Sequence, residues 1–165
     1  MPEHISKDTR ELGALIDQGV QLLTRLQTLL DTELAALESR NVEQLQQNNQ
    51  LKQECLQALE YNIRDRNARL ARLGVETSRQ AVIDFIHTLP SSASASLKQR
   101  WQQLETSLDQ VRALNLRNEQ TLLRSKQNTD QLLALLRGHV RDNTTIYDQK
   151  GDKGRYEGQR SLGKA

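Results

Sequence analysis

Leucine and isoleucine recur at alternating steps of three and four residues along most of the chain, and this spacing constrains the fold more than any other feature. Such spacing puts one apolar stripe on an α-helix and is typical of helices that pack along a narrow seam. We expect the first such helix over residues 7–38. Its seam has two exceptions: Gly19, which would permit a close helix approach, and Glu33, for which the sequence offers no explanation. The seam positions are 12, 16, 19, 23, 26, 30, 33 and 37.

A second seam begins after residues 39–41, where the register of the stripe changes. Asn41 precedes Gln44 with the spacing of a capping box, and Gly74 is typical of a helix C-terminus. We therefore expect a tight turn and a helix over 42–73. Two helices of equal length with a short connection favour an antiparallel hairpin. The second seam consists of Val42, Leu45, Asn49, Lys52, Leu56, Leu59, Ile63, Arg66, Leu70 and Leu73.

Residues 74–96 contain a short apolar segment between two loop-like stretches. We expect a short helix over 78–88 that covers one end of a bundle with Ile83, Phe85, Ile86 and Leu89.

The third seam is the most regular of the three and predicts a helix over 97–138, roughly 15 Å longer than either earlier helix at 1.5 Å per residue. It consists of Leu97, Trp101, Leu104, Leu108, Val111, Asn115, Asn118, Leu122, Ser125, Thr129, Leu132 and Leu136. The last segment, 139–165, is rich in glycine and predicts a non-helical, flexible arm. The expected fold class is all-α: an elongated antiparallel bundle of three long helices with one short helix and a non-helical C-terminal tail.

Two asparagines, Asn115 and Asn118, occupy seam positions where leucine is usual. One interpretation is that they fix helix register or oligomeric state at some cost in stability. The other is that the distal part of this helix forms a groove for a helix of another chain. The groove would be lined by Asn115, Leu116, Asn118, Leu122, Leu123, Leu132, Leu133 and Leu136.

Charge and apolar content disfavour nucleic-acid and membrane functions. The formal net charge is +2, with acidic and basic residues interspersed, so no electrostatic footprint for nucleic acid is indicated. No apolar run approaches the ~18 residues that span a bilayer, and the first residues do not resemble a signal peptide. The single Cys55 fits a reducing compartment. We expect a cytoplasmic protein without direct membrane insertion.

The residue inventory also disfavours an enzyme. His4, His87 and His139 are far apart, and no His or Cys pair has metal-ligand spacing. The tail segment GDKGRYEG lacks the Gly-Lys-Ser/Thr ending of a phosphate-binding loop. We expect no catalytic residue, no metal and no cofactor.

The segment WQQLETSLDQVRALNLRNEQTLL resembles the part of the FlgN family in which a tryptophan precedes a leucine-rich helix and then N-x-x-N-G-x-L-L. The residues that match are Trp101, Asn115, Asn118, Leu122 and Leu123. After the helix, residues 147–151 resemble the family's Tyr-Gly-x-x-Gly element. The chain departs from the pattern at Glu119 and Asp148, where the family has glycine.

This resemblance implies a cytoplasmic type III secretion chaperone for the hook-associated proteins that join the flagellar hook to its filament. Such a chaperone holds the terminal helical segment of its client, prevents premature assembly and delivers the client to the export gate. The resemblance assigns Tyr147 to docking on the export gate. We further expect Ile146 and Tyr156 to be recognition residues of the tail, because Tyr combines an apolar ring with a polar end.

Two other functions stay open from sequence. A coiled-coil scaffolding protein, in which polar seam residues select a homo-oligomer, would self-assemble without binding such clients. A helical nucleic-acid binder would use the arginines between residues 64 and 72, and its affinity would fall steeply with salt. Whether the free protein is a monomer or a homodimer also stays open.

Overall fold

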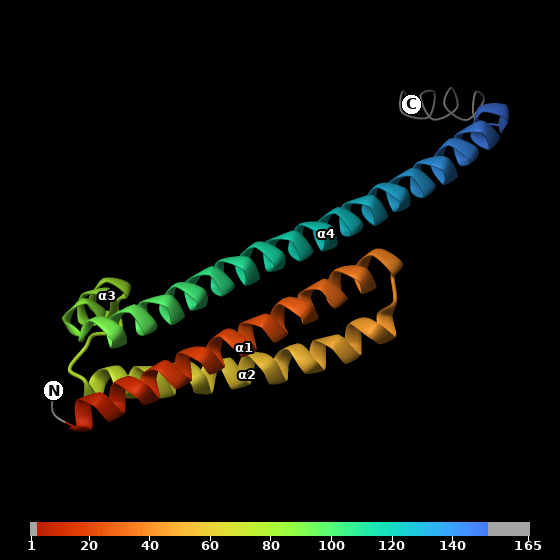
Figure 1. Ribbon diagram of the computed structural model, residues 1–165. Coiled ribbons are helices and arrows are strands. Elements are labelled where there is room, and N and C mark those ends of the chain that lie inside the picture. Colours follow the sequence, from red (N-terminus) through yellow and green to blue (C-terminus); the bar gives the residue numbers. More distant parts are fainter. Residues whose placement is uncertain (1–2, 152–165) are drawn as a thin grey trace. The chain divides into compact units, whose positions relative to one another are not determined.

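A computed structural model of the chain describes the backbone of residues 3–151 and the side chains of residues 3 and 5–137. Within this range the chain forms α1 (Glu3–Ser39), α2 (Val42–Arg72), α3 (Arg79–Thr88) and α4 (Ser91–Gly151) (Figure 1). The described residues include no strand, which confirms the all-α class. The chain divides into two compact units, the first ending at Thr121 and the second beginning at Leu122.

The bounds of α2 and α3 and the end of α1 agree to within one residue with the helices expected over 7–38, 42–73 and 78–88, but α1 begins at Glu3 and not at residue 7. α4 is longer than the expected 97–138 at both ends. At its start, the Pro90 carbonyl accepts a hydrogen bond from the Ser94 N–H at 2.8 Å, and the serines and alanines that follow Pro90 fit a helical first turn. At its end, Gly138 costs about 1 kcal/mol relative to Ala, which weakens a helix but does not terminate it. The helix therefore continues to Gly151 into the segment expected as an arm.

The turn between α1 and α2 is closed by backbone hydrogen bonds around a left-handed residue. Arg40 has φ 53°, and the Asn41 N–H donates to the Ala36 carbonyl at 2.9 Å, as in a Schellman motif. The Asn41 side chain accepts from the Gln44 N–H at 3.0 Å, so the predicted cap of α2 is confirmed. The hairpin is thus closed by its own backbone and one side chain.

The end of α2 has the same arrangement with glycine in the left-handed position. Gly74 has φ 71°, its N–H donates to the Ala71 carbonyl at 3.0 Å, and the Val75 N–H donates to the Leu70 carbonyl at 2.9 Å. This confirms Gly74 as the C-terminal stop. Ser78 then caps α3 by accepting from the Ala81 N–H at 3.2 Å.

α1 and α2 lie side by side and antiparallel (Figure 1). Hydrogen bonds between them repeat every seven residues. The donors are three buried side chains of α2, and the acceptors are three backbone carbonyls of α1. If α2 slid along α1, these buried donors would lose their acceptors. The three hydrogen bonds therefore fix the register of the hairpin. The pairs are Asn48 Nδ2 to Leu29 O at 3.0 Å, Cys55 Sγ to Leu22 O at 3.3 Å, and Asn62 Nδ2 to Leu15 O at 2.8 Å.

The inward face of α2 therefore differs from the expected seam. Val42, Leu56 and Ile63 are exposed, although the leucine pattern placed them inside. The prediction was wrong for these positions because it counted only apolar side chains. The face turned to α1 also carries buried asparagines, whose polar atoms are satisfied by backbone carbonyls of α1.

The first unit's part of α4 shows a related difference. Leu97, Leu104 and Asn118 are buried as expected, but Leu108 and Asn115 are exposed. Their expected inward places are taken by residues one position earlier: Ser107 is buried, and Leu114 packs against the core.

α3 and Gly19 both contribute to packing in the first unit. Phe85, Ile86 and Leu89 pack in or against the same apolar cluster as the residues of α1, as expected for this segment. Ile83, which was also expected there, is half-buried and outside the cluster, and Val82 is buried in it instead. A Cβ at Gly19 would lie 2.9 Å from Asn62 Oδ1 and 3.1 Å from a methyl of Leu104, so Gly19 does permit a close approach.

Candidate functional site

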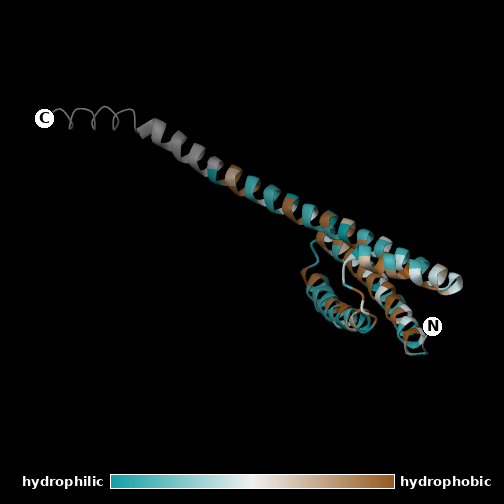
Figure 2. Cartoon of the chain, turned by 90° about the vertical axis from the view of Figure 1, so that its left-hand side faces the viewer, coloured by the Kyte–Doolittle hydropathy of each residue, from teal (hydrophilic) through white to brown (hydrophobic). Residues whose placement is uncertain are grey.

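The second unit exposes large apolar side chains along α4. Figure 2 shows hydrophobic residues recurring between hydrophilic ones along this helix. Between residues 122 and 137, the exposed fractions of the leucines range from 45% for Leu133 to 69% for Leu135. Clustered exposed apolar side chains usually mark a surface that binds another protein, whereas single exposed apolar residues are ordinary. The exposed leucines of this unit are Leu122, Leu123, Leu132, Leu133, Leu135 and Leu136.

The seven-residue repeat of α4 continues through this surface. Leu104 and Asn118 face the core of the first unit, and Ser125 and Leu132 follow Asn118 at intervals of seven along the same helix. The helix face that is buried in the first unit is therefore continued by one small polar residue, Ser125, and one leucine, Leu132, in the second. This composition fits a surface that receives a helix of another chain.

Three residues of the predicted groove, Asn115, Leu116 and Asn118, belong to the first unit, and of these Asn115 and Leu116 are exposed whereas Asn118 is buried. Sequence reasoning placed Leu122, Leu123, Leu132, Leu133 and Leu136 in the groove as well, and all five are exposed in the second unit. It omitted Leu135, which lies between two predicted leucines.

Asn118 lies inside the bundle and has an exposed fraction of 3%. Its Nδ2 donates to the Leu30 carbonyl at 2.7 Å and to Glu33 Oε2 at 2.8 Å. Its Oδ1 accepts from Arg117, whose Nη2 also donates to Asp31 at 3.0 Å. All polar atoms of the Asn118 amide are thus engaged with groups of its own chain, which supports the register interpretation for this residue.

The same contacts explain Glu33. Lys52 Nζ lies 2.5 Å from Glu33 Oε1, and the two side chains are 22% and 13% exposed. Glu33 of α1, Lys52 of α2 and Asn118 of α4 are therefore three polar seam residues that meet in one cluster. No local motif reveals this cluster, because its members come from three different helices.

The tail residues of the prediction cannot be placed as side chains. Ile146 and Tyr147 lie on the backbone of α4, but their side chains are outside the described residues, as is the whole of Tyr156. Their proposed roles stay predictions.

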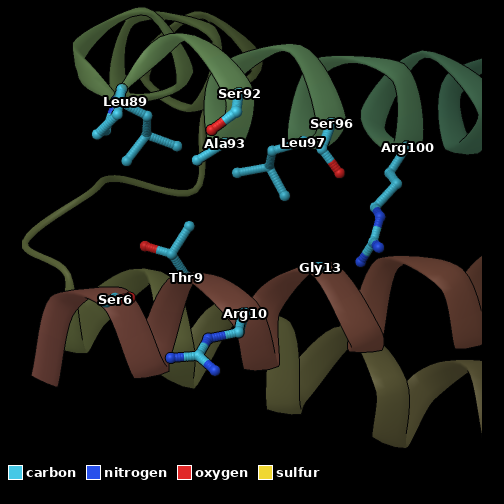
Figure 3. A pocket seen from close by; sticks show the side chains of 11 residues that line it. Ser6, Thr9, Arg10, Gly13, Leu89, Ser92, Ala93, Ser96, Leu97 and Arg100 are labelled. Atoms are coloured by element: carbon cyan, nitrogen blue, oxygen red, sulfur yellow. The ribbon is translucent and has the colours of Figure 1, made fainter. Parts of the chain in front are cut away.

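A cavity of about 510 Å³ lies in the first unit between the start of α1 and the start of α4 (Figure 3). Arg10, Arg100, Thr9 and three serines contribute polar atoms to its lining, and Arg100 reaches Asp17 at 3.2 Å. The described lining offers no nucleophile beside a base, so it does not form a catalytic arrangement. Over the described residues, no three His, Cys, Asp or Glu side chains gather in a way that could hold a metal ion.

Among the described residues, no helix has an apolar stretch of the length and hydropathy that crossing a membrane requires.

Comparisons with known proteins identify the family of the chain. The family model described as FlgN protein matches residues 1–155. Among solved structures, the chain is similar to the crystal structure of a protein of Pseudomonas aeruginosa assigned as flagella synthesis protein flgn. The TM-score is 0.59 and the sequence identity 28%, over 70% of this chain and 89% of that one. The search of curated proteins gives no match. Since the family model spans nearly the whole sequence, the chain belongs to the FlgN family.

Proposed function

We propose that this protein is a cytoplasmic type III secretion chaperone of flagellar assembly. It binds the terminal helical segment of hook-associated proteins, prevents their premature assembly and delivers them to the export gate. The observation that carries this proposal is the row of exposed leucines between residues 122 and 137 on α4. Membership of the FlgN family supports the flagellar context.

The energetics of such binding are those of coupled folding. A client segment that is disordered when free loses conformational entropy as it becomes helical, which costs roughly 2–5 kcal/mol of the gross interaction energy. Full burial of one leucine side chain contributes about 1.5–3 kcal/mol. Several half-exposed leucines on α4 can therefore offset the ordering cost when a client helix covers them.

The residues divide into three roles in this proposal. Leu116, Asn115 and the leucines of the second unit contact the client. Asn118, which lies within the bundle, instead holds α4 on α1. Tyr147 docks on the export gate, while Ile146 and Tyr156 contribute to recognition by the tail.

Calorimetric titration with the C-terminal region of a hook-associated protein tests the proposal. The full-length protein should bind at micromolar concentrations or below. A double variant, Leu132→Ser with Leu136→Ser, should weaken binding by about tenfold or more, because each substitution removes a large part of a buried leucine's contribution. The matched control is Gln127→Ser with Gln131→Ser, two exposed polar positions on the same helix, which should leave affinity within about twofold.

A coiled-coil scaffold is the second candidate, because an exposed leucine row with heptad spacing also suits self-association. Sedimentation equilibrium separates the two functions. A scaffold would form a stable homo-oligomer and show no affinity for the client segment. In that case the Leu132→Ser, Leu136→Ser double variant would sediment as a smaller species.

A further inference from the structure

Asn118 is the last buried side chain along the described part of α4. From residue 119 to residue 137, where the description of side chains ends, Thr121 and Ser125 are half-buried and all the others are exposed. The buried side chain before Asn118 is Ser107, roughly three turns earlier. The residues between these two are half-buried or exposed. The attachment of α4 to the core of the first unit therefore ends at Asn118.

This attachment depends on Glu33 of α1. Glu33 Oε2 accepts a hydrogen bond from Asn118 Nδ2 at 2.8 Å, and Glu33 Oε1 pairs with Lys52 Nζ of α2 at 2.5 Å. A carboxylate that is largely shielded from water is costly unless both of its oxygens are paired, and here both are. Glu33 thus connects the last buried residue of α4 to both helices of the hairpin.

The segment that follows Asn118 has little of its own that would keep it helical. Helices in proteins are stabilised mainly by the packing of a buried face, and a short helix without such a face is marginal in water. Residues 119–137 have no buried side chain, and five of them belong to types with low helix propensity. These five are Thr121, Ser125, Asn128, Thr129 and Asp130.

A turn that is already helical makes the following residues easier to fold. Nucleation of a new helix is unfavourable by a factor on the order of 10⁻³, whereas each residue added to an existing helix gains one hydrogen bond. Residues 119–137 therefore become helical by extension from the turn that Asn118 anchors. Their helical population depends on how firmly that turn is held.

We propose that Glu33 is a positioning residue for client binding, because through Asn118 it holds the turn from which the leucine-bearing helix extends. The inference rests on the proposed function and deepens it. A client that binds only the helical form has an apparent affinity proportional to the helical population of that segment. Glu33 thus acts on client binding without touching the client.

The test combines amide hydrogen exchange of the free full-length chain with calorimetric titration against the C-terminal region of a hook-associated protein. Glu33→Ala removes an acceptor of Asn118 and the partner of Lys52, but leaves the sequence of α4 unchanged. Exchange over residues 119–137 should become faster, because the helix opens more often. Client affinity should fall by about threefold or more, in proportion to the lost helical population.

The matched control is Glu38→Ala, which removes an exposed glutamate near the end of the same helix. It should leave the exchange rates over 119–137 and the client affinity within about twofold of the wild type.

A rescue experiment separates this role from a merely structural one. The pair Asn128→Gln with Asp130→Glu keeps one amide and one carboxylate but raises the helix propensity of the segment. Added to Glu33→Ala, the pair should recover client affinity by about twofold or more, although it restores no contact of Glu33. A residue that only stabilised the bundle would not be rescued by substitutions in the exposed part of α4.

Three outcomes would overturn the inference. If the wild type binds and the Leu132→Ser, Leu136→Ser variant binds weakly, but Glu33→Ala binds as tightly as the wild type, the inference fails while the proposed function stands. If Glu33→Ala binds weakly and the Asn128→Gln, Asp130→Glu pair recovers nothing, Glu33 does not act through the helical population. If the wild type does not bind the client at all, the proposed function fails and this inference with it.

Discussion

Asn118 of α4 donates a hydrogen bond to Glu33 of α1 over 2.8 Å, from a position that is almost fully buried. The second oxygen of Glu33 pairs with Lys52 of α2, so one carboxylate links three helices. A buried charge of this kind is tolerated because both of its oxygens are paired. The cluster therefore holds α4 in register on the hairpin.

Removing the Asn118 amide should destabilise the protein. Asn118→Ala leaves Glu33 Oε2 and the Leu30 carbonyl without a donor, and an unpaired buried acceptor costs about 1–3 kcal/mol. Asn115→Ala, three residues earlier and exposed, should change stability by less than about 0.5 kcal/mol. Urea unfolding of both variants measures the difference. Equal stability of the two would contradict the role given to Asn118.

Two glycines of α1 should respond to alanine in opposite ways. At Gly19 a Cβ would meet Asn62 Oδ1 and Leu104, both held in the core, and overpacking of this kind costs about 1–3 kcal/mol. At Gly13 the nearest atoms belong to the flexible end of Arg100, so Gly13→Ala should be neutral or gain up to about 1 kcal/mol from helix propensity. The thermal unfolding midpoints of Gly19→Ala and Gly13→Ala test these two expectations. A more stable Gly19→Ala would show that the helices are not in close contact there.

The turn between α1 and α2 contains a strained residue that glycine should relieve. Arg40 has φ 53°, a conformation that costs an L-residue roughly 1–2 kcal/mol and glycine almost nothing. Arg40→Gly should therefore raise stability by up to about 1 kcal/mol, after its larger unfolded-state entropy is counted. Gly74→Ala, at φ 71° with no atom near its would-be Cβ, should lose stability for the converse reason. Chemical denaturation measures whether Arg40→Gly gains stability and Gly74→Ala loses it. If Arg40→Gly is less stable than the wild type, the backbone at Arg40 is not strained.

Cys55 should behave as an inert, protonated thiol. Burial raises its pKa above the ordinary 9.0, and Arg25 opposes this shift only in part. The raised pKa contributes stability that is fully present below the unfolded-state pKa, near pH 9, and is lost as pH rises through the folded pKa. The unfolding free energy of the wild type should thus fall more steeply above pH 9 than that of Cys55→Ser. Rapid reaction of the native protein with a thiol reagent at neutral pH would contradict this.

Much of the architecture follows from local signals in the sequence. The periodicity of leucine identified the three long helices, and an apolar segment between two loops identified α3. Asn41 and Gly74 marked the two ends of α2, because caps depend on residues near in sequence. The start of α4 was missed because Ser91 and its neighbours resemble a loop in composition but accept a helical conformation after Pro90.

The inward faces of α2 and α4 were harder to predict. Asn48 and Asn62 are buried because backbone carbonyls of α1 accept their hydrogen bonds, and such partners do not appear in a hydropathy pattern. Glu33 remained unexplained for the same reason: its partners lie in α2 and α4. Of the candidate site, Leu122, Leu123, Leu132, Leu133 and Leu136 were predicted from the sequence, whereas Leu135, which is also exposed, was missed.

Amide hydrogen exchange of the full-length protein, with and without the C-terminal region of a hook-associated protein, tests the central claim most directly. The account predicts that client binding slows exchange in peptides covering residues 122–137, where the exposed leucines lie, because a covered helix opens less often. Unchanged exchange over these residues, at client concentrations that saturate binding, would show that the client binds elsewhere and would contradict the account.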